Sequence, residues 1–235
     1  SDGTHRSNLI CVQTTCRDCI NFSLEDMPRC VGCGHRCSKC QKWNIKLNKF
    51  EAPPCPSCGT RDFYFKGYDC VSQFCKWLLH PSHRKYRVIG HNAGRFDFYP
   101  LIKYFVSQSI IPEIVFNGGK ILFMRIARSL NIKFLDSLNF LHFKLAKFNQ
   151  TFDLPHIKKG AFPFLFLRRE NLEYVGPYPD AKYFGIANMK TDELADFHEW
   201  YESVKNETSN LDKEMIEYCK TDVSRSRQGY LRFRR

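Results

Sequence analysis

The sequence predicts an α/β (α+β) protein with a mixed β-sheet flanked by helices and a small cysteine-rich insertion near the N-terminus. Three observations lead to this prediction. Hydrophobic residues make up 43% of the 235 residues, enough for a substantial core. Strand-like and helix-like segments alternate after residue 60. Ten of the 12 cysteines precede residue 71, so the first part of the chain differs in kind from the rest.

Four segments have the composition of β-strands. Residues 7–15 are apolar and β-branched, and residues 87–90 form a short apolar run. Residues 113–127, "EIVFNGGKILFMRIA", predict two strands joined by a tight Asn-Gly-Gly turn. Residues 131–141 begin as a strand and turn helical near Ser137.

Other segments have helical spacing or capping signals. Apolar residues recur at helical spacing in 69–79 and 96–106. Thr191 is a candidate N-cap followed by acidic residues, and a last helix is expected over 211–231. Residues 154–187 are rich in Pro, Gly and aromatic residues, which predicts an irregular loop.

The chain is strongly basic. It has 36 Lys and Arg against 24 Asp and Glu, a formal net charge of +12. This balance favours polyanionic partners, nucleic acid first, although a protein that is merely basic would also fit. No apolar run approaches the roughly 18 residues of a membrane span, and the start lacks the pattern of a signal peptide. We therefore expect a soluble, intracellular protein without a membrane partner; nucleus, organelle and virus stay open as its location.

Eight cysteines form four Cys-x-x-Cys pairs. Two thiolates separated by one tight turn reach the same tetrahedral ion, so four pairs predict two structural Zn²⁺ sites. Disulfides are the alternative, disfavoured without a secretory signal. Sequential and interleaved pairing of the motifs both fit. The predicted ligands are Cys16, Cys19, Cys30, Cys33, Cys37, Cys40, Cys55 and Cys58. The remaining cysteines are interpreted as small buried hydrophobic residues: Cys11, Cys70, Cys75 and Cys219.

Two polar motifs suggest phosphodiester chemistry. In "VIGHNAGRFDFYPLI", residues 88–102, an apolar strand leads to Asn92 and then to Asp97 at the expected start of a helix. In "EYCKTDV", Tyr218 and Asp222 are four residues apart and share a helix face. A helix-dipole acid and a solvated helix face are the structural alternatives. Carboxylates that bind Mg²⁺ or Mn²⁺ can activate a water and stabilise a leaving oxygen.

These motifs resemble those of family B DNA polymerases. "HNAGRFD" resembles the second exonuclease motif, and "YCKTD" the third. "SLNFL", with Ser137, Leu138 and Leu141, resembles the Ser/Thr-Leu-x-x-hydrophobic motif of the protein-primed branch. "KGAF", starting at Lys159, resembles the Lys-x-x-hydrophobic motif of that branch. "IKKGAFPFLF", "YVGPYP" and "FHEWYE" are similar to segments of organellar, viral and transposon-borne (Polinton or Maverick) polymerases, which also tend to carry Cys-x-x-Cys pairs before the second motif.

The resemblance implies an RNase H-like 3′–5′ exonuclease region of a DNA-directed DNA polymerase that acts in DNA replication. The implied partners are DNA, as a single-stranded 3′ end and primer-template, and a terminal priming protein. The implied roles are magnesium ligands for Asp97 and Asp222, contacts to the 3′ end for Asn92, Ser137 and Leu138, orientation of the attacking water for Tyr218, and support of the scissile phosphate for Lys159.

Several neighbouring residues have competing interpretations. Phe96 and Phe98 fit base stacking or a hydrophobic core, and we favour the core because they alternate with Asp97. His91 is interpreted as a hydrogen-bonded structural residue. His80 and His83 could bind metal, but a solvated turn is the preferred interpretation.

One motif of the family is missing from this sequence. The resemblance requires an Asp-x-Glu pair on a first strand that should lie just before "SDGTHRSNL"; Asp2 is the only acidic residue there, and we expect this first strand to be missing. We expect an early exonuclease strand over 1–15, a zinc module over 16–60 and an exonuclease domain over 61–235 that stops before the polymerase palm. Because a two-metal site needs its bridging carboxylate, the isolated chain is expected to be nearly inactive. The alternatives are a domesticated, non-catalytic nucleic-acid-binding zinc protein on an inactive nuclease scaffold and a zinc-linked protein-interaction domain.

Overall fold

The computed structural model describes residues 7–15, 60–126, 129–154 and 161–234 of the chain. These residues belong to two compact units. The first unit comprises Ser1–Pro155 together with Val223–Arg235, and the second comprises His156–Asp222. Among the described residues, no helix is long and apolar enough to cross a membrane.

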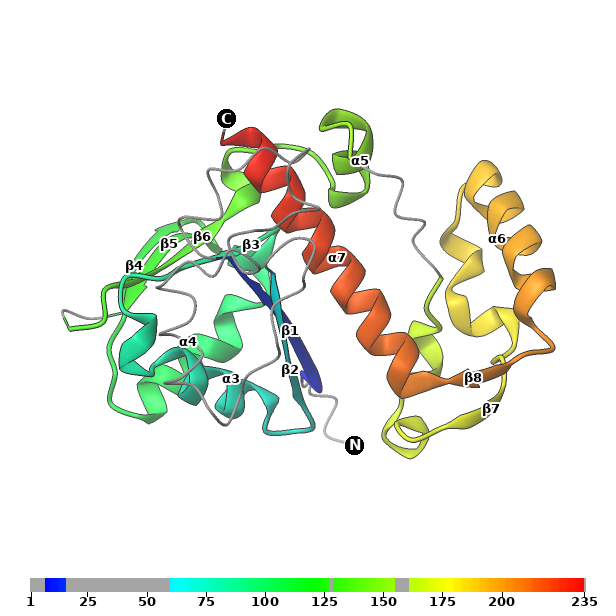
Figure 1. Cartoon of the computed structure of the whole chain (residues 1–235), viewed down its shortest axis with the longest axis horizontal. Coiled ribbons are helices and arrows are strands. Elements are labelled where there is room, and N and C mark those ends of the chain that lie inside the picture. The colour runs from blue at the N-terminus through cyan, green and yellow to red at the C-terminus, as the bar shows by residue number, and fades with distance from the viewer. Residues whose placement is uncertain (1–6, 16–59, 127–128, 155–160, 235) are drawn as a thin grey trace. The chain divides into compact units, whose positions relative to one another are not determined.

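A four-stranded mixed sheet forms the centre of the first unit (Figure 1). Its order is β3-β6-β5-β4, with β3 and β6 parallel and the other neighbours antiparallel. The bounds are β3 Arg87–Gly90, β4 Glu113–Asn117, β5 Lys120–Ile126 and β6 Ile132–Asp136. The prediction of a mixed sheet flanked by helices is therefore confirmed.

The predicted hairpin connects β4 and β5. Asn117 pairs with Lys120 across a turn that consists of Gly118 and Gly119. Gly118 has φ +55°, a conformation that costs little only without a side chain, and this explains the local sequence.

Two amphipathic helices bury their apolar faces in the same hydrophobic core as this sheet. They are α3 (Cys70–Leu78) and α4 (Phe98–Ser107). The rings of Phe98 and Phe105 lie 5.6 and 6.0 Å from that of Phe134 on β6. Full burial of such a ring stabilises the fold by roughly 1.5–3 kcal/mol, so these contacts fix α4 on the sheet.

A second sheet, of two strands, joins the same core. β1 (Leu9–Thr14) and β2 (Arg61–Lys66) are antiparallel, and Thr14 pairs with Arg61. Phe63 and Phe65 of β2 are buried against Trp77 of α3. β1 was predicted, whereas β2 was not. The eight predicted zinc ligands fall between these strands, outside the described residues.

The first unit also contains the end of a long helix. This helix, α7 (Leu211–Phe233), starts in the second unit and matches the predicted last helix. Gly229 of α7 faces Phe148 of α5 (Phe148–Thr151), where a Cβ atom would approach the ring to 2.2 Å. The helix therefore needs a glycine at this contact.

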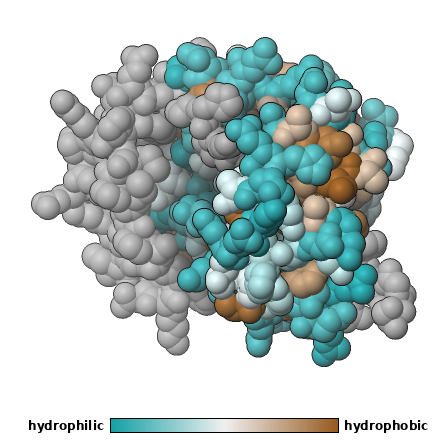
Figure 2. Space-filling model, turned by 90° about the vertical axis from the view of Figure 1, so that its right-hand side faces the viewer, coloured by the Kyte–Doolittle hydropathy of each residue, from teal (hydrophilic) through white to brown (hydrophobic). Residues whose placement is uncertain are grey.

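The second unit contains β7 (Val175–Pro177), β8 (Thr208–Asn210), α6 (Thr191–Val204) and the start of α7. Between 161 and 190 the chain forms short 3₁₀ turns and one short strand, close to the predicted irregular loop. Thr191 is the first residue of α6 and not its N-cap, so that prediction was wrong; Lys190 precedes it with an extended backbone. Phe197 is the buried residue of α6. The described part of the surface in Figure 2 is mainly hydrophilic.

Two predictions about exposure need correction. Phe98 is buried as predicted, at 2%, but Phe96 is 65% exposed. Phe96 lies between the 3₁₀ turn Ala93–Arg95 and α4, whereas Phe98 is the first residue of α4. His83 is fully buried rather than solvated. Its Nδ1 lies 2.7 Å from the Trp77 carbonyl oxygen, so Nδ1 is the donor. Its ring packs between those of Trp77 and Tyr86.

The burial of His83 predicts a loss of stability in acid. Desolvation lowers its pKa from 6.5 to about 4, and the hydrogen bond to Trp77 opposes this shift. Protonation therefore favours the unfolded chain, so the stability is fully present above pH 6.5 and falls as the pH drops toward 4. We expect His83→Phe to remove roughly 3 kcal/mol of this pH dependence, measured by urea unfolding across the window.

The exposed His198 of α6 supplies the matched control, because it belongs to the second unit and His83 to the first. His198→Gln should leave the slope of stability against pH unchanged. An unchanged slope in His83→Phe would show that other groups cause the acid sensitivity.

Candidate functional site

The candidate residues of the first unit lie at one edge of the sheet. β3 and β6 are parallel, and their last residues, Gly90 and Asp136, are paired. The chain therefore leaves both strands at the same edge, toward Asn92 after β3 and toward Leu138 after β6. Two sequence motifs 44 residues apart are brought together in this way.

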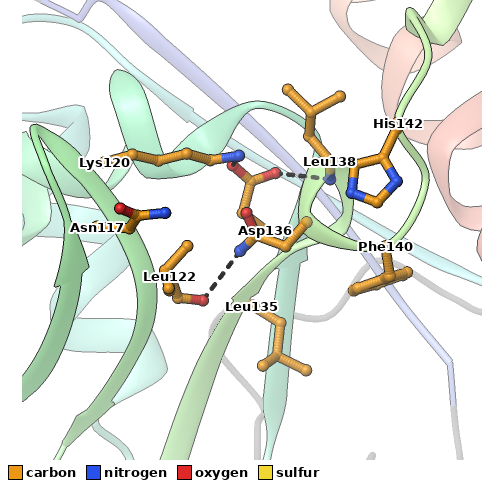
Figure 3. A pocket seen from close by; sticks show the side chains of 9 residues that line it. Asn117, Lys120, Leu122, Leu135, Asp136, Leu138, Phe140 and His142 are labelled. Carbon is orange, nitrogen blue, oxygen red and sulfur yellow. Dashed lines mark hydrogen bonds and ion pairs between the residues drawn. The ribbon is translucent and has the colours of Figure 1, made fainter.

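A buried carboxylate connects the two loops. Asp136 is 1% exposed because strand alternation places it on the same buried face as Phe134. Its Oδ1 accepts hydrogen bonds from the backbone N–H groups of Asn92 (2.8 Å) and Leu138 (2.9 Å). Its Oδ2 accepts one from the Gly94 N–H (3.1 Å) and lies 3.7 Å from the Lys120 ammonium (Figure 3).

The loop after β3 has a conformation that its sequence explains. Asn92 has φ +63°, in the left-handed region that asparagine tolerates better than most residues. Gly94 passes so close to β5 that a Cβ atom would lie 2.2 Å from the Ile121 carbonyl oxygen. The small residues of "HNAGRFD" are thus required by the approach of this loop to the sheet.

His91 and Ser137 form a second connection between the loops. His91 Nδ1 lies 3.0 Å from Ser137 Oγ, and Nε2 lies 3.0 Å from the Phe143 carbonyl oxygen. The Ser137 hydroxyl donates to the Gly90 carbonyl oxygen at 3.0 Å. Desolvation lowers the pKa of His91, and the Phe143 carbonyl opposes this shift. The interpretation of His91 as a structural residue is confirmed.

Ser137 is fully buried, and its hydroxyl group is engaged within this network. Leu138, the next residue, is only partly buried. Any contact of this motif with a ligand would therefore involve Leu138 and the backbone more directly than the serine hydroxyl group.

Asp97 occupies the N-cap position of α4, as the sequence predicts, but its side chain makes no capping hydrogen bond. The residue is exposed, yet the surrounding protein still displaces water from its carboxyl group. This desolvation raises the pKa of Asp97, and the negative charge of Asp136 raises it further. The carboxylates of Asp97 and Asp136 near this loop thus favour the binding of a cation beside them.

Tyr218 and Asp222 belong to the second unit, on α7. Their spacing of four residues places them on one helix face, as predicted. The Tyr218 ring contacts Phe162 and Phe164, with centroids 5.6 and 5.1 Å away. Lys159 lies outside the described residues. Asp97 and Asp222 are thus described in separate units, and their prediction as joint magnesium ligands stays a prediction.

Sequence reasoning missed four polar residues around a hollow of about 550 Å³ beside Asp136 (Figure 3). One of them, Asn139, donates from Nδ2 to the Leu122 carbonyl oxygen at 3.1 Å. Leu138 also lines this hollow, so the hollow adjoins a residue that is predicted to contact the 3′ end. The polar lining residues outside the predicted set are Asn117, Lys120, Asn139 and His142, and Asp136 was missed as well.

Within the described ranges, no group of three or more His, Cys, Asp or Glu residues is placed to hold a metal ion. Cys70 and Cys75 are buried, as predicted, whereas Cys11 and Cys219 are only partly buried. Zinc binding by the Cys-x-x-Cys pairs stays a prediction, since all eight cysteines fall outside these ranges.

The fold and the site define a class: an α/β protein whose mixed sheet carries acidic and amide residues on the loops at one edge. Residues 81–228 match the sequence profile of a family described as DNA polymerase type B, organellar and viral. The chain belongs to this family, and the resemblance of its motifs is confirmed at that level.

Two curated relatives agree with this assignment. A "Probable DNA polymerase" of Neurospora intermedia is 31% identical over 159 residues, which cover 64% of this chain and 16% of the relative. A "Probable DNA polymerase" of Agaricus bitorquis is 28% identical over 145 residues, which cover 60% of this chain and 18% of the relative. The chain thus spans less than a fifth of either relative. No solved structure matches it.

The close approach of Gly94 to β5 predicts an intolerant position. We expect Gly94→Ala to destabilise the protein by about 1–3 kcal/mol, because the new Cβ atom would meet a backbone carbonyl that cannot rotate away. Chemical denaturation measures this. Gly119→Ala is the matched control, since its Cβ would have no neighbour within 4 Å, and it should change stability by less than about 0.5 kcal/mol. Equal effects at both positions would contradict the proposed packing.

Proposed function

We propose that the chain is part of a DNA-directed DNA polymerase and carries its RNase H-like 3′–5′ exonuclease region. One observation carries the proposal: the loop with Asn92 and Asp97 and the loop with Leu138 leave the same sheet edge and share the Asp136 carboxylate. These are the loops that the motif resemblance assigns to the 3′ end of DNA. Membership of the polymerase family supports the same assignment.

In this proposal the acidic residues hold magnesium. Oxygen atoms of carboxylates are the ligands that Mg²⁺ prefers, and Asp97 is exposed at the start of α4. Asp97 and Asp222 would hold the metal, Tyr218 would orient the attacking water, and Lys159 would support the scissile phosphate. When bound, two ions would activate that water and stabilise the leaving oxygen.

Other residues would bind the DNA strand. Asn92 and Leu138 would contact the single-stranded 3′ end, and the buried Ser137 would contribute through its backbone. The exposed ring of Phe96 next to Asp97 supports stacking on a base rather than a position in the core. The formal charge of +12 favours a polyanion, and longer polymerases of the protein-primed type would add the primer-template and a terminal priming protein as partners.

The Cys-x-x-Cys segment would bind two structural zinc ions. It lies between β1 and β2, whose ends are adjacent because Thr14 pairs with Arg61. An insertion at such a position leaves the strand pairing intact, and zinc would supply the stability that this segment cannot obtain from a core of its own.

The nuclease proposal predicts activity that depends on a complete carboxylate set. The chain as given should degrade a 5′-labelled single strand poorly with Mg²⁺ or Mn²⁺. An N-terminal extension that carries the family's Asp-x-Glu strand should restore degradation from the 3′ end. In the extended protein, Asp97→Ala and Asp222→Ala should each lower the rate on the order of a hundredfold or more.

Matched acidic residues control for the loss of charge alone. Glu113→Ala removes an exposed carboxylate from the unit that contains Asp97, and Glu217→Ala removes one from α7, the helix of Asp222. Both variants should leave the rate unchanged. If the extended protein binds single strands but does not cut them, the catalytic proposal fails and the non-catalytic binding protein becomes the better account.

The zinc proposal is tested by replacing the segment with a turn. A variant with Asn-Gly in place of residues 16–59 should close β1 and β2 into a tight hairpin. We expect the full chain to hold about two zinc ions by elemental analysis, following four thiolates per site. The hairpin variant should hold none and keep its near-ultraviolet circular dichroism from the aromatic core. Zinc retained by the variant, or a full chain without zinc, would refute the assignment.

A further inference from the structure

We propose that Asp136 is a positioning residue for binding of a single-stranded 3′ end and that it is not itself a metal ligand. This inference deepens the function proposed above and rests on it. Asp136 is not among the residues that the polymerase motifs of this sequence assign to metal or DNA.

The position of its hydrogen bonds supports the first part. One oxygen atom, Oδ1, accepts the N–H groups of both Asn92 and Leu138, the residues proposed to contact the strand. The two residues come from different loops, so the carboxylate fixes the backbone of one relative to the other. Bonds from backbone N–H groups to a charged acceptor are among the stronger hydrogen bonds in proteins.

The hydrogen bonds of the carboxylate support the second part. Asp136 is 1% exposed, and three backbone N–H groups donate to it: those of Asn92 and Leu138 to Oδ1 and that of Gly94 to Oδ2. A carboxylate offers about four lone-pair directions, so these three hydrogen bonds use most of its acceptor capacity. The Lys120 ammonium forms an ion pair with Oδ2 at 3.7 Å. A metal ion would have to compete with this ammonium and with the backbone N–H groups.

Lys120 completes the arrangement. Its side chain is 19% exposed, and its ammonium lies 3.7 Å from Oδ2, where it balances a charge that would be costly to bury alone. Lys120 also lines the hollow beside Leu138. The same residue thus supports the buried carboxylate and leaves positive charge next to the proposed strand site.

The test compares Asp136→Asn with the wild-type full chain in buffer without Mg²⁺ or Mn²⁺, which prevents cleavage and leaves the proposed zinc ions in place. Asparagine has nearly the same size as aspartate, but its N–H₂ group would face backbone N–H groups that are themselves donors. We expect the affinity for a short linear oligothymidylate with a free 3′ end to fall on the order of tenfold. Binding of a circular oligothymidylate of equal length, which has no 3′ end, should not change. Glu113→Gln is the matched charge control, because it removes one exposed carboxylate from the same sheet.

Amide hydrogen exchange by NMR separates positioning from general stability. In Asp136→Asn, the amides of Asn92, Gly94 and Leu138 should lose protection while those of β5, such as Met124, keep theirs. Unchanged affinity for the linear strand, or a loss of protection throughout the sheet, would overturn the proposal.

If Asp136→Asn fails to fold, a titration of the wild-type chain with the linear strand still tests the proposal. Adding the linear strand should shift the amide signals of Asn92 and Leu138 together, and shifts at neither would overturn the inference. If the wild-type chain binds no single strand at all, the proposed function fails with the DNA part of this inference. The amide protection of the wild-type chain and of Asp136→Asn then decides whether Asp136 connects the loops.

Discussion

Both candidate loops depend on the parallel pairing of β3 with β6. In an antiparallel pair the ends of the two strands would lie at opposite edges, and the motifs of Asn92 and Leu138 would be separated by the length of a strand. The register matters as much as the direction. Because Gly90 pairs with Asp136, the last residue of each strand lies at the edge, and the carboxylate reaches both loops. A shift by one residue would turn Asp136 to the opposite face of the sheet.

The buried charge makes this arrangement specific. Asp136 is stable in the core only where several donors surround it, so the two loops must approach it in one conformation. That requirement explains the left-handed backbone of Asn92 and the absence of a side chain at Gly94. The pKa of Asp97 is raised mainly by desolvation, and the charge of Asp136 adds to this shift. The buried carboxylate thus affects both the packing and the electrostatics of this edge.

The sequence predicted most elements because their signals are local. Alternation, the Asn-Gly-Gly turn and helical spacing gave the hairpin, β3, β6, α4 and α7. The "RDFYFK" alternation of β2 was also present, but it stands directly after the predicted cysteine-rich insertion (16–60) and was not recognised as a strand. Phe96 and His83 were misjudged although their neighbours are near in sequence. Apolar spacing does not show that a 3₁₀ turn precedes Phe96, or that the rings of Trp77 and Tyr86 pack on His83. Asp136 was missed because two of its hydrogen-bond donors, Asn92 and Gly94, are 44 and 42 residues away in sequence. No sequence pattern distinguishes such a buried aspartate from a surface one.

The folding unit extends beyond the segment that the polymerase profile matches. That segment begins at residue 81, after β1, β2 and α3. Yet Phe63 and Phe65 of β2 lie 4.8 and 5.7 Å from Trp77, and α3 shares the core with α4 and the central sheet. Burial of each ring contributes about 1.5–3 kcal/mol, a large share of a net stability of about 5–15 kcal/mol. Residues 81–228 alone would therefore expose the core surface that α3 covers. The profile marks what the chain shares with polymerases, whereas burial determines which residues must fold together to hold Asp136 and its loops.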